Sequence, residues 1–288
     1  MKCGQRARAR ALTAIAILLT ACTEGEMHDS TATAPPIRTT SAASVEASLA
    51  TVATTHVYFG HQSVGANILA GLRELSAQAS RPRMSIVSTR DLGSVSAPAL
   101  VEFAIGENGD AASKASDFTA AIDALSPNAT GVALFKYCYL DLTSRTDVAQ
   151  LFSGHRASVR ALQSRHPGLV FVHVTAPLTT AEPASKALLK RVLGKPSSRE
   201  ANVKRNEFNA LLRREFQGEP IFDLARIESS RPDGSRAFFT AGGDTVYTLA
   251  AELTDDGGHL NQVGRRAAAA ELLSVLATAA SSTARGRH

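Results

Sequence analysis

Apolar residues follow two different spacings along this chain. Short apolar runs that end in Gly, Pro or polar turns are typical of buried strands, and apolar residues three and four apart are typical of amphipathic helices. The runs predict strands at residues 56–59, 84–88, 131–135, 169–174 and 220–224. The helical spacing predicts helices at 45–52, from 64 onward, at 117–125 with Ser116 or Asp117 as the cap, and at 148–162, 201–216 and 262–277.

The predicted strands alternate with the predicted helices. This alternation favours an α/β fold, in which a parallel sheet of five strands is covered by helices on both faces. Neither a change in composition nor an internal repeat marks a boundary, so we expect one domain over residues 45–280 and a disordered tail over 281–288.

Two stretches fit this scheme less well. Residues 183–199 are rich in Lys, Ser and Pro and predict a loop with one short helix. Residues 229–249 form a long insertion before the last helix. Long loops at the carboxyl edge of a sheet often shape a substrate site, so we expect this insertion to be a lid.

The N-terminus has the form of an export signal. A basic start is followed by an apolar run from Ala11 to Leu19, which is too short to span a bilayer. The end of this run, Leu-Thr-Ala-Cys22, resembles a bacterial lipobox, in which the cysteine becomes the lipidated first residue. We expect a signal peptide at 1–21, a flexible Ser/Thr/Pro-rich tether at 22–44 and a lipid anchor on Cys22; the alternative is an ordinary signal cleaved after Ala21.

Charge and cysteines exclude two classes of protein. The formal charge of +5 falls to +1 without the four basic residues of the predicted signal, which removes any argument for nucleic-acid binding. Once Cys3 and Cys22 are assigned to the signal and the anchor, Cys138 is the only thiol, so no internal disulfide is predicted. No cysteine or histidine cluster suggests structural zinc.

Ser63 is the first candidate nucleophile. It stands in Val57-Tyr-Phe-Gly-His-Gln-Ser-Val-Gly-Ala-Asn-Ile-Leu69, where a strand runs through a tight turn into a helix. Ligands of open α/β folds bind at this edge of the sheet, and the positive end of a helix stabilises negative charge. The alternative is that Ser63 only caps the helix.

Asp256 and His259 are the candidate partners of a serine nucleophile. They lie three residues apart in Thr254-Asp-Asp-Gly-Gly-His-Leu-Asn261, before the last helix. A serine needs an imidazole base at neutral pH, and a carboxylate fixes the tautomer of that base. The alternative is that the aspartates shape a turn and that His259 is a surface residue.

Together the two motifs resemble the SGNH hydrolases, also called GDSL-type esterases and lipases. Phe-Gly-His-Gln-Ser63 follows the first strand, and Asp256-Gly-Gly-His259-Leu-Asn precedes the last helix. The resemblance implies a three-layer, flavodoxin-like sandwich with Ser63 as nucleophile, His259 as general base and Asp256 as its orienting partner. It also implies acyl transfer to Ser63 followed by hydrolysis, without metal or cofactor.

The chain departs from the family at the oxyanion donors. The usual Gly-Asp-Ser is Gly60-His-Gln-Ser63, and the segment 136–141 contains no asparagine where the family has Gly-x-Asn-Asp. Gly109 and Asn108 are candidate donors. The hypothesis is that Asn108, the backbone amide of Ser63 or a side chain near Cys138 fills the role, because a donor lost without replacement costs roughly two to three orders of magnitude in rate.

Two functions from different classes follow. The first is a lipid-anchored serine esterase of the cell envelope that acts on small or carbohydrate-linked esters, such as acetyl esters. The second is a non-catalytic envelope lipoprotein that binds a ligand on the same fold. Lesser candidates are a metal held by His61, Asp256 and His259, and Cys138 as a nucleophile or as a small buried residue.

Overall fold

The computed structural model describes residues 41–80 and 83–285. The predicted signal peptide, the lipidation site Cys22 and most of the tether lie outside the described residues. The sheet is parallel, as predicted, but it has six strands in the order β2-β3-β1-β4-β5-β6. The strands are β1 (Val57–His61), β2 (Ile86–Ser88), β3 (Leu100–Ala104), β4 (Gly131–Phe135), β5 (Leu169–Val174) and β6 (Ile221–Phe222).

The prediction of five strands is wrong because it omits β3. In the sequence, Glu102 interrupts the apolar run of this strand. In the structure, the Glu102 side chain is only partly buried and accepts a hydrogen bond from His61 Nε2 on the adjacent strand β1 (3.0 Å). A polar partner on a neighbouring strand therefore lets a glutamate occupy an inner strand.

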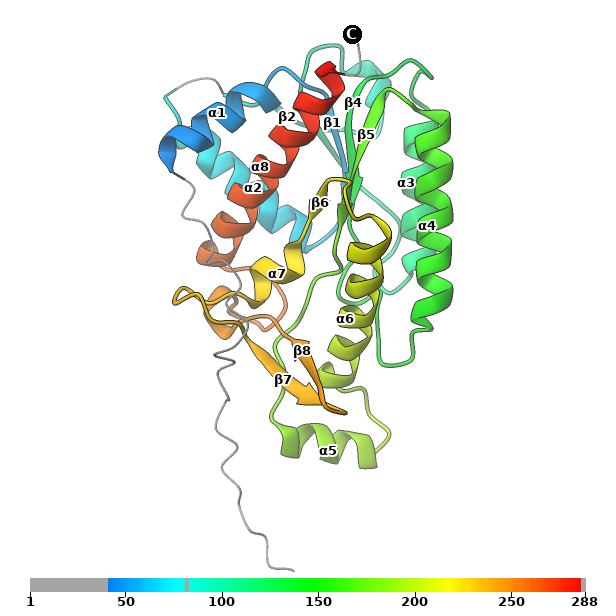
Figure 1. Cartoon of the computed structure of the whole chain (residues 1–288), viewed down its shortest axis with the longest axis vertical. Helices are drawn as coiled ribbons and strands as arrows, with labels where there is room; N and C mark the ends of the chain where they lie inside the picture. The colour runs from blue at the N-terminus through cyan, green and yellow to red at the C-terminus, as the bar shows by residue number, and fades with distance from the viewer. Residues whose placement is uncertain (1–40, 81–82, 286–288) are drawn as a thin grey trace, which may run out of the picture.

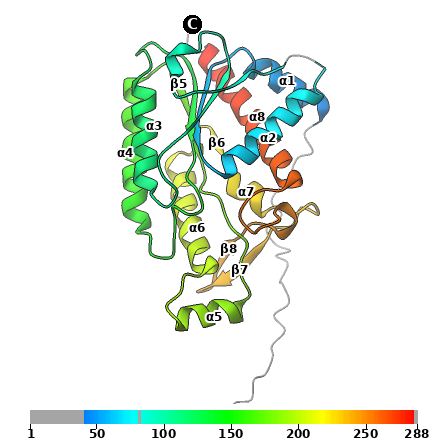
Figure 2. The ribbon, with the colours of Figure 1, turned by 180° about the vertical axis from the view of Figure 1, so that it is seen from behind.

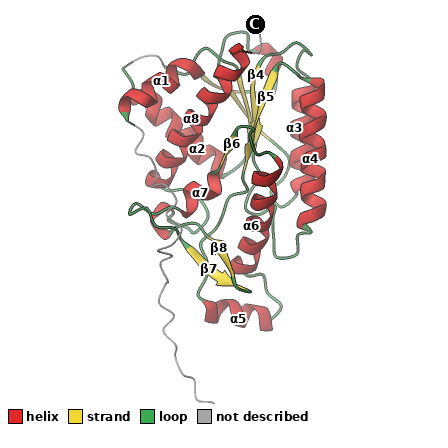
Figure 3. Cartoon of the chain, in the orientation of Figure 1, coloured by secondary structure: helices red, strands yellow, loops and turns green. Residues whose placement is uncertain are grey.

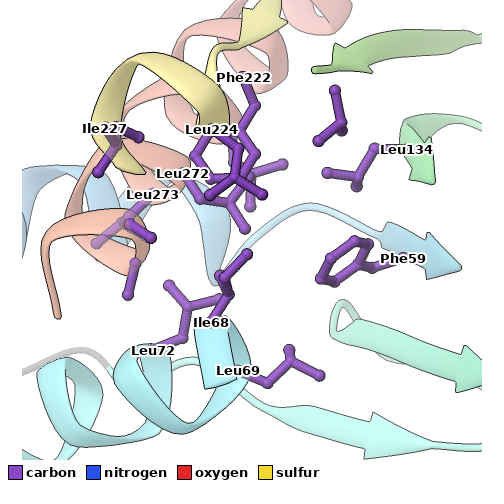
Figure 4. Packing of buried hydrophobic residues seen from close by; sticks show 14 of the residues in the cluster. Phe59, Ile68, Leu69, Leu72, Leu134, Phe222, Leu224, Ile227, Leu272 and Leu273 are labelled. Carbon is purple, nitrogen blue, oxygen red and sulfur yellow. The ribbon is translucent and has the colours of Figure 1, made fainter. Parts of the chain in front are cut away.

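Helices cover both faces of the sheet, which confirms the three-layer α/β/α architecture (Figures 1 and 2). One face carries α1 (Ala42–Val52), α2 (Val64–Gln78), α7 (Leu224–Ser229) and α8 (Gln262–Arg285), and the other carries α3 (Ala111–Asp123), α4 (Val148–Arg165) and α6 (Ser198–Glu215). On the first face, residues of β1, β4 and β6 pack against α2, α7 and α8 (Figure 4). The buried apolar residues of both faces lie between Leu49 and Ala280, so a chain that starts at Ser41 contains this whole core.

Three predicted boundaries are corrected. Helix α1 begins at Ala42, inside the predicted tether, and Ser41 caps it by accepting from the N–H of Ser44. Helix α8 continues to Arg285, so residues 281–285 are helical rather than disordered. Helix α3 begins at Ala111 and is capped by Asp110, not by Ser116 or Asp117.

The two irregular stretches contain short elements at one end of the molecule (Figure 3). Residues 183–199 contain α5 (Ala184–Val192), as the sequence predicts. The insertion at 229–249 contains an antiparallel hairpin of β7 (Phe238–Ala241) and β8 (Asp244–Tyr247). Among residues 41–80 and 83–285, no helix combines the length and apolar character that crossing a bilayer requires.

Candidate active site

Ser63 stands where β1 passes into α2, in the middle of the sheet. Strand β1 pairs with β3 on one side and β4 on the other, so the loops that follow these two strands flank the serine turn. Ser63 has φ 51° and ψ −107°, and within the described part of the chain it is the only non-glycine residue with positive φ. Such backbone strain costs about 1–3 kcal/mol and concentrates at functional sites.

Ser63 does not act as a simple helix cap. Its side chain makes no capping hydrogen bond, which argues against the capping alternative. Instead, its hydroxyl lies 2.6 Å from His259 Nε2, and His259 Nδ1 lies 2.6 Å from Asp256 Oδ2. An ionised carboxylate can only accept, so Nδ1 carries the proton and Nε2 accepts from the serine hydroxyl. The structure thus brings the three predicted residues into one hydrogen-bonded series.

The carboxylate of Asp256 is held by its own turn. Its Oδ1 accepts the backbone N–H groups of Gly258 (2.9 Å) and His259 (2.7 Å). Hydrogen bonds from the His259 and Gly258 groups hold the pKa of Asp256 well below its usual range. Asp256 therefore stays ionised and keeps His259 in the tautomer that accepts a proton at Nε2.

The additional residue in the serine turn is accommodated by the end of β1. His61 belongs to the strand and directs Nε2 to Glu102, away from the His259 pair. Gln62 donates to the carbonyl oxygens of Ile105 (2.8 Å) and Gly106, which ties the serine turn to the loop after β3. Of the three residues considered for a metal, His61 thus pairs with Glu102, whereas Asp256 and His259 pair with each other. The described residues contain no group of three or more His, Cys, Asp or Glu placed to hold a metal.

Gly109 is not free to donate to an oxyanion in this structure. Its N–H donates to Asp141 Oδ1 (2.8 Å), and Asp141 Oδ2 accepts the N–H of Cys138 (2.6 Å). Lys114 donates to both Asp141 oxygens, at 2.9 and 2.8 Å, and both side chains are completely buried. This ion pair joins the first turn of α3 to the loop after β4, and the Gly109 hydrogen bond joins the loop after β3 to the same carboxylate.

Asn108 and the amide of Ser63 remain as candidate oxyanion donors. Lys114 Nζ donates to Asn108 Oδ1 (2.8 Å), which fixes the side-chain amide and leaves its NH2 group to face another acceptor. The Ser63 N–H has no acceptor among the described residues. Sequence reasoning named both donors but missed Lys114 and Asp141, which hold one of them.

Helix α6 holds the segment that follows β5, and this segment contacts the turn that carries Asp256 and His259. The N–H of Ala176 donates to Asn209 Oδ1 (2.7 Å), and Asn209 Nδ2 donates to the carbonyl oxygen of Ala176 (2.9 Å). Arg205 donates to Thr179 Oγ1 (2.9 Å), and the next residue, Thr180, donates its N–H to the carbonyl of Gly257 (2.9 Å). The segment after β5 is therefore held between α6 and the turn that carries His259.

Two buried ionisable groups lie near this segment. Burial lowers the pKa of Lys136 to about 8 and raises the pKa of Glu228 to about 8. Lys136 donates to the Tyr137 carbonyl (3.0 Å), and Glu228 accepts the N–H of Leu178 (2.6 Å). Cys138 is buried as well, which agrees with its alternative as a small core residue.

No protein-family model matches the chain, and a search of curated proteins finds no match. Among solved structures, it is similar to a GDSL-like lipase from Bacteroides thetaiotaomicron, with 11% identity over 80% of this chain and 88% of that chain and a TM-score of 0.47. It is also similar to an acetyl xylan esterase (16% identity, 77% and 99% covered, TM-score 0.42) and to the C-terminal domain of Drosophila Oskar (12%, 76% and 86%, 0.38). Likeness at this level gives no basis for transferring an activity, so function must be argued from the site.

Proposed function

We propose that this protein is a serine ester hydrolase of the SGNH type, with Ser63, His259 and Asp256 as its triad. The observation that carries the proposal is the pair of 2.6 Å contacts, Ser63 Oγ to His259 Nε2 and His259 Nδ1 to Asp256 Oδ2. The strained φ of Ser63 supports it, because a serine that only capped a helix would gain nothing from that strain.

The geometry supports a double displacement. Ser63 Oγ attacks the ester carbonyl carbon while its proton passes to His259 Nε2. The tetrahedral intermediate then expels the alcohol, which takes that proton, and leaves an acyl group on Ser63. Water attacks the acyl carbonyl with His259 as base, and the carboxylic acid departs. The Ser63 N–H and the Asn108 amide stabilise the oxyanion in both steps.

The experiment that tests this proposal is hydrolysis of short-chain p-nitrophenyl esters and acetylated glycans by the chain from Ser41 onward. Ser63→Ala and His259→Ala should each reduce the rate to background. Ser274→Ala, which changes an exposed serine on α8, is the matched control and should leave the rate unchanged. A rate that survives Ser63→Ala would exclude this serine as the nucleophile.

The alternative of a non-catalytic binding protein rests on one observation. The loop after β4 offers Asp141, an acceptor, where the family has a donor asparagine. If neither ester class is hydrolysed and a fluorophosphonate does not label Ser63, the binding protein is the better account. The intact series of hydrogen bonds from Ser63 to Asp256 favours the enzyme, since a binding site has no need of it.

We also propose that the protein works in the cell envelope, anchored through a lipid on Cys22. Only the N-terminal sequence supports this, because the lipobox-like Leu-Thr-Ala-Cys22 lies outside the described residues. Mass spectrometry of the protein from bacterial membranes should find a lipidated Cys22 as the first residue. A mature chain that begins elsewhere would exclude the anchor.

A further inference from the structure

Residues 183–197 form an arm that stands out at the end of the molecule where β7 and β8 lie (Figures 1 and 2). Its base is closed by two reciprocal hydrogen bonds: the Glu182 N–H donates to Ser198 Oγ (3.1 Å), and the Ser198 N–H donates to Glu182 Oε1 (3.0 Å). Glu182 also pairs with Lys190 of α5 (2.5 Å). The arm is therefore fixed at its base and contains its own helix, α5.

The arm exposes an apolar face. Leu188, Leu189, Val192 and Leu193 are 62%, 59%, 75% and 57% exposed. The spacing of the first three places them on one side of α5, and Leu193 follows directly after the helix. They account for four of the six large exposed hydrophobic residues among those that the structure describes. Single exposed apolar residues are common, but a contiguous cluster marks a surface that meets an apolar partner.

The charges around this apolar face favour an anionic partner. Residues 183–199 contain no aspartate or glutamate, whereas Lys186 and Lys195 are exposed beside the apolar face. Leucines on one side of a helix and lysines around them are the pattern of helices that lie in the interface of an anionic bilayer. A second copy of the arm would instead bring like charges together.

The arm is linked to the candidate active site through a short segment. Residues 175–182 connect β5 to the arm, and within them Thr180 donates its N–H to the carbonyl of Gly257, two residues before His259. The arm and the serine turn therefore both extend from the carboxyl edge of the sheet. A surface that holds the arm also holds the catalytic turn near it.

We propose that the arm docks on the surface of a bilayer that contains anionic lipids, with Leu188, Leu189, Val192 and Leu193 in the interface and the lysines among the headgroups. Docking brings the Ser63 site to esters that partition into the bilayer. The docking itself does not depend on catalysis, whereas the choice of substrate rests on the proposed function.

Binding to vesicles tests the docking. The chain from Ser41 onward, carrying Ser63→Ala, is sedimented with vesicles of phosphatidylcholine alone or with phosphatidylglycerol added. It should bind the anionic vesicles, and Leu189→Ser/Val192→Ser should weaken binding about tenfold without a change in melting temperature. Lys186→Gln/Lys195→Gln should remove the dependence on phosphatidylglycerol. Val263→Ser, at a valine of 56% exposure on α8, is the matched control and should bind as before.

Three results would overturn the docking: no vesicle binding, binding that Leu189→Ser/Val192→Ser leaves intact, or a dimer in light scattering that this double variant abolishes. The substrate part is tested with the active protein. Leu189→Ser/Val192→Ser should lose about tenfold in rate on an ester dispersed in anionic vesicles and keep its rate on a soluble ester. Vesicle binding without hydrolysis of any ester would leave the docking standing and refute the proposed function.

Discussion

Asp141→Asn probes the buried ion pair between Lys114, at the start of α3, and Asp141, in the loop after β4. The substitution keeps the shape of the side chain and removes its charge, so the Lys114 ammonium remains in the core without its counterion. Both side chains have no exposed surface, and among the residues that the structure describes the Lys114 ammonium has only Asp141 and Asn108 Oδ1 as hydrogen-bond partners. Removing one partner of a buried ion pair lowers the free energy of unfolding by roughly 3–5 kcal/mol.

The expected loss of stability can be measured by urea unfolding. For a domain of this size, such a loss corresponds to a melting temperature lower by about 10 °C. The matched control is Asp123→Asn, because Asp123 is exposed and pairs with Arg165 through two hydrogen bonds at the surface. Asp123 Oδ1 also accepts from His166 Nε2 (2.9 Å), and the Oδ1 of asparagine can accept the same bond. That variant should lose less than about 1 kcal/mol. Equal losses in the two variants would refute the reasoning from burial.

A double variant separates stability from catalysis. In Lys114→Met/Asp141→Asn neither member of the pair carries a charge, so most of the stability should return. The Asn108 amide, however, loses the Lys114 Nζ that holds its oxygen. The rate constant kcat should therefore stay about 10²-fold below wild type with KM little changed, the size of effect seen when one oxyanion donor is lost. Full recovery of kcat would show that Lys114 does not position Asn108.

Three other substitutions have defined outcomes. Asp256→Asn should lower kcat roughly 10³–10⁴-fold because its histidine partner loses the acceptor that fixes its tautomer; an effect below tenfold on the ester hydrolysis rate would contradict this. Gly65→Ala should cost about 1–3 kcal/mol in urea unfolding because its Cβ would lie 2.5 Å from the ring of His61, whereas Gly154→Ala on α4, with no atom within 4 Å, should be neutral or stabilising. Burial raises the pKa of Glu228 from 4.5 to about 8, so the unfolded chain releases this proton at lower pH than the folded chain, and stability falls as pH rises across that interval. Glu228→Gln should flatten this fall, and an unchanged slope would refute the assignment.

The residues of the proposed triad could be singled out from the sequence because each lies in a short local motif. Asp256 and His259 are three residues apart, and the turn between them is closed by their own backbone. Ser63 follows an apolar strand and precedes an amphipathic helix, so its place at the sheet edge follows from the pattern alone. Only the contact between Ser63 and the distant pair needed the tertiary structure.

The omission of β3 from the predicted sheet also affected the prediction of the site. Without β3, the loop that carries Asn108 could not be placed beside β1, although the register pairs β1 with β3 along its whole length. The ion pair of Lys114 and Asp141 could not be predicted from the sequence for a different reason. They are 27 residues apart, and a lysine in a predicted helix or an aspartate in a loop looks like a surface residue until the core is closed around both.

The position of Asp141 explains why the buried lysine is needed. In the family pattern the loop after the middle strand supplies an amide donor, whereas here the corresponding loop after β4 supplies a carboxylate that accepts from Cys138 and Gly109. An unpaired carboxylate beside a developing oxyanion would oppose catalysis, because like charges repel strongly where water is excluded. Lys114 cancels that charge and, with the same Nζ, holds Asn108 Oδ1 in the loop after β3. In the proposed mechanism, one buried ammonium therefore both neutralises the carboxylate and positions Asn108, the proposed donor.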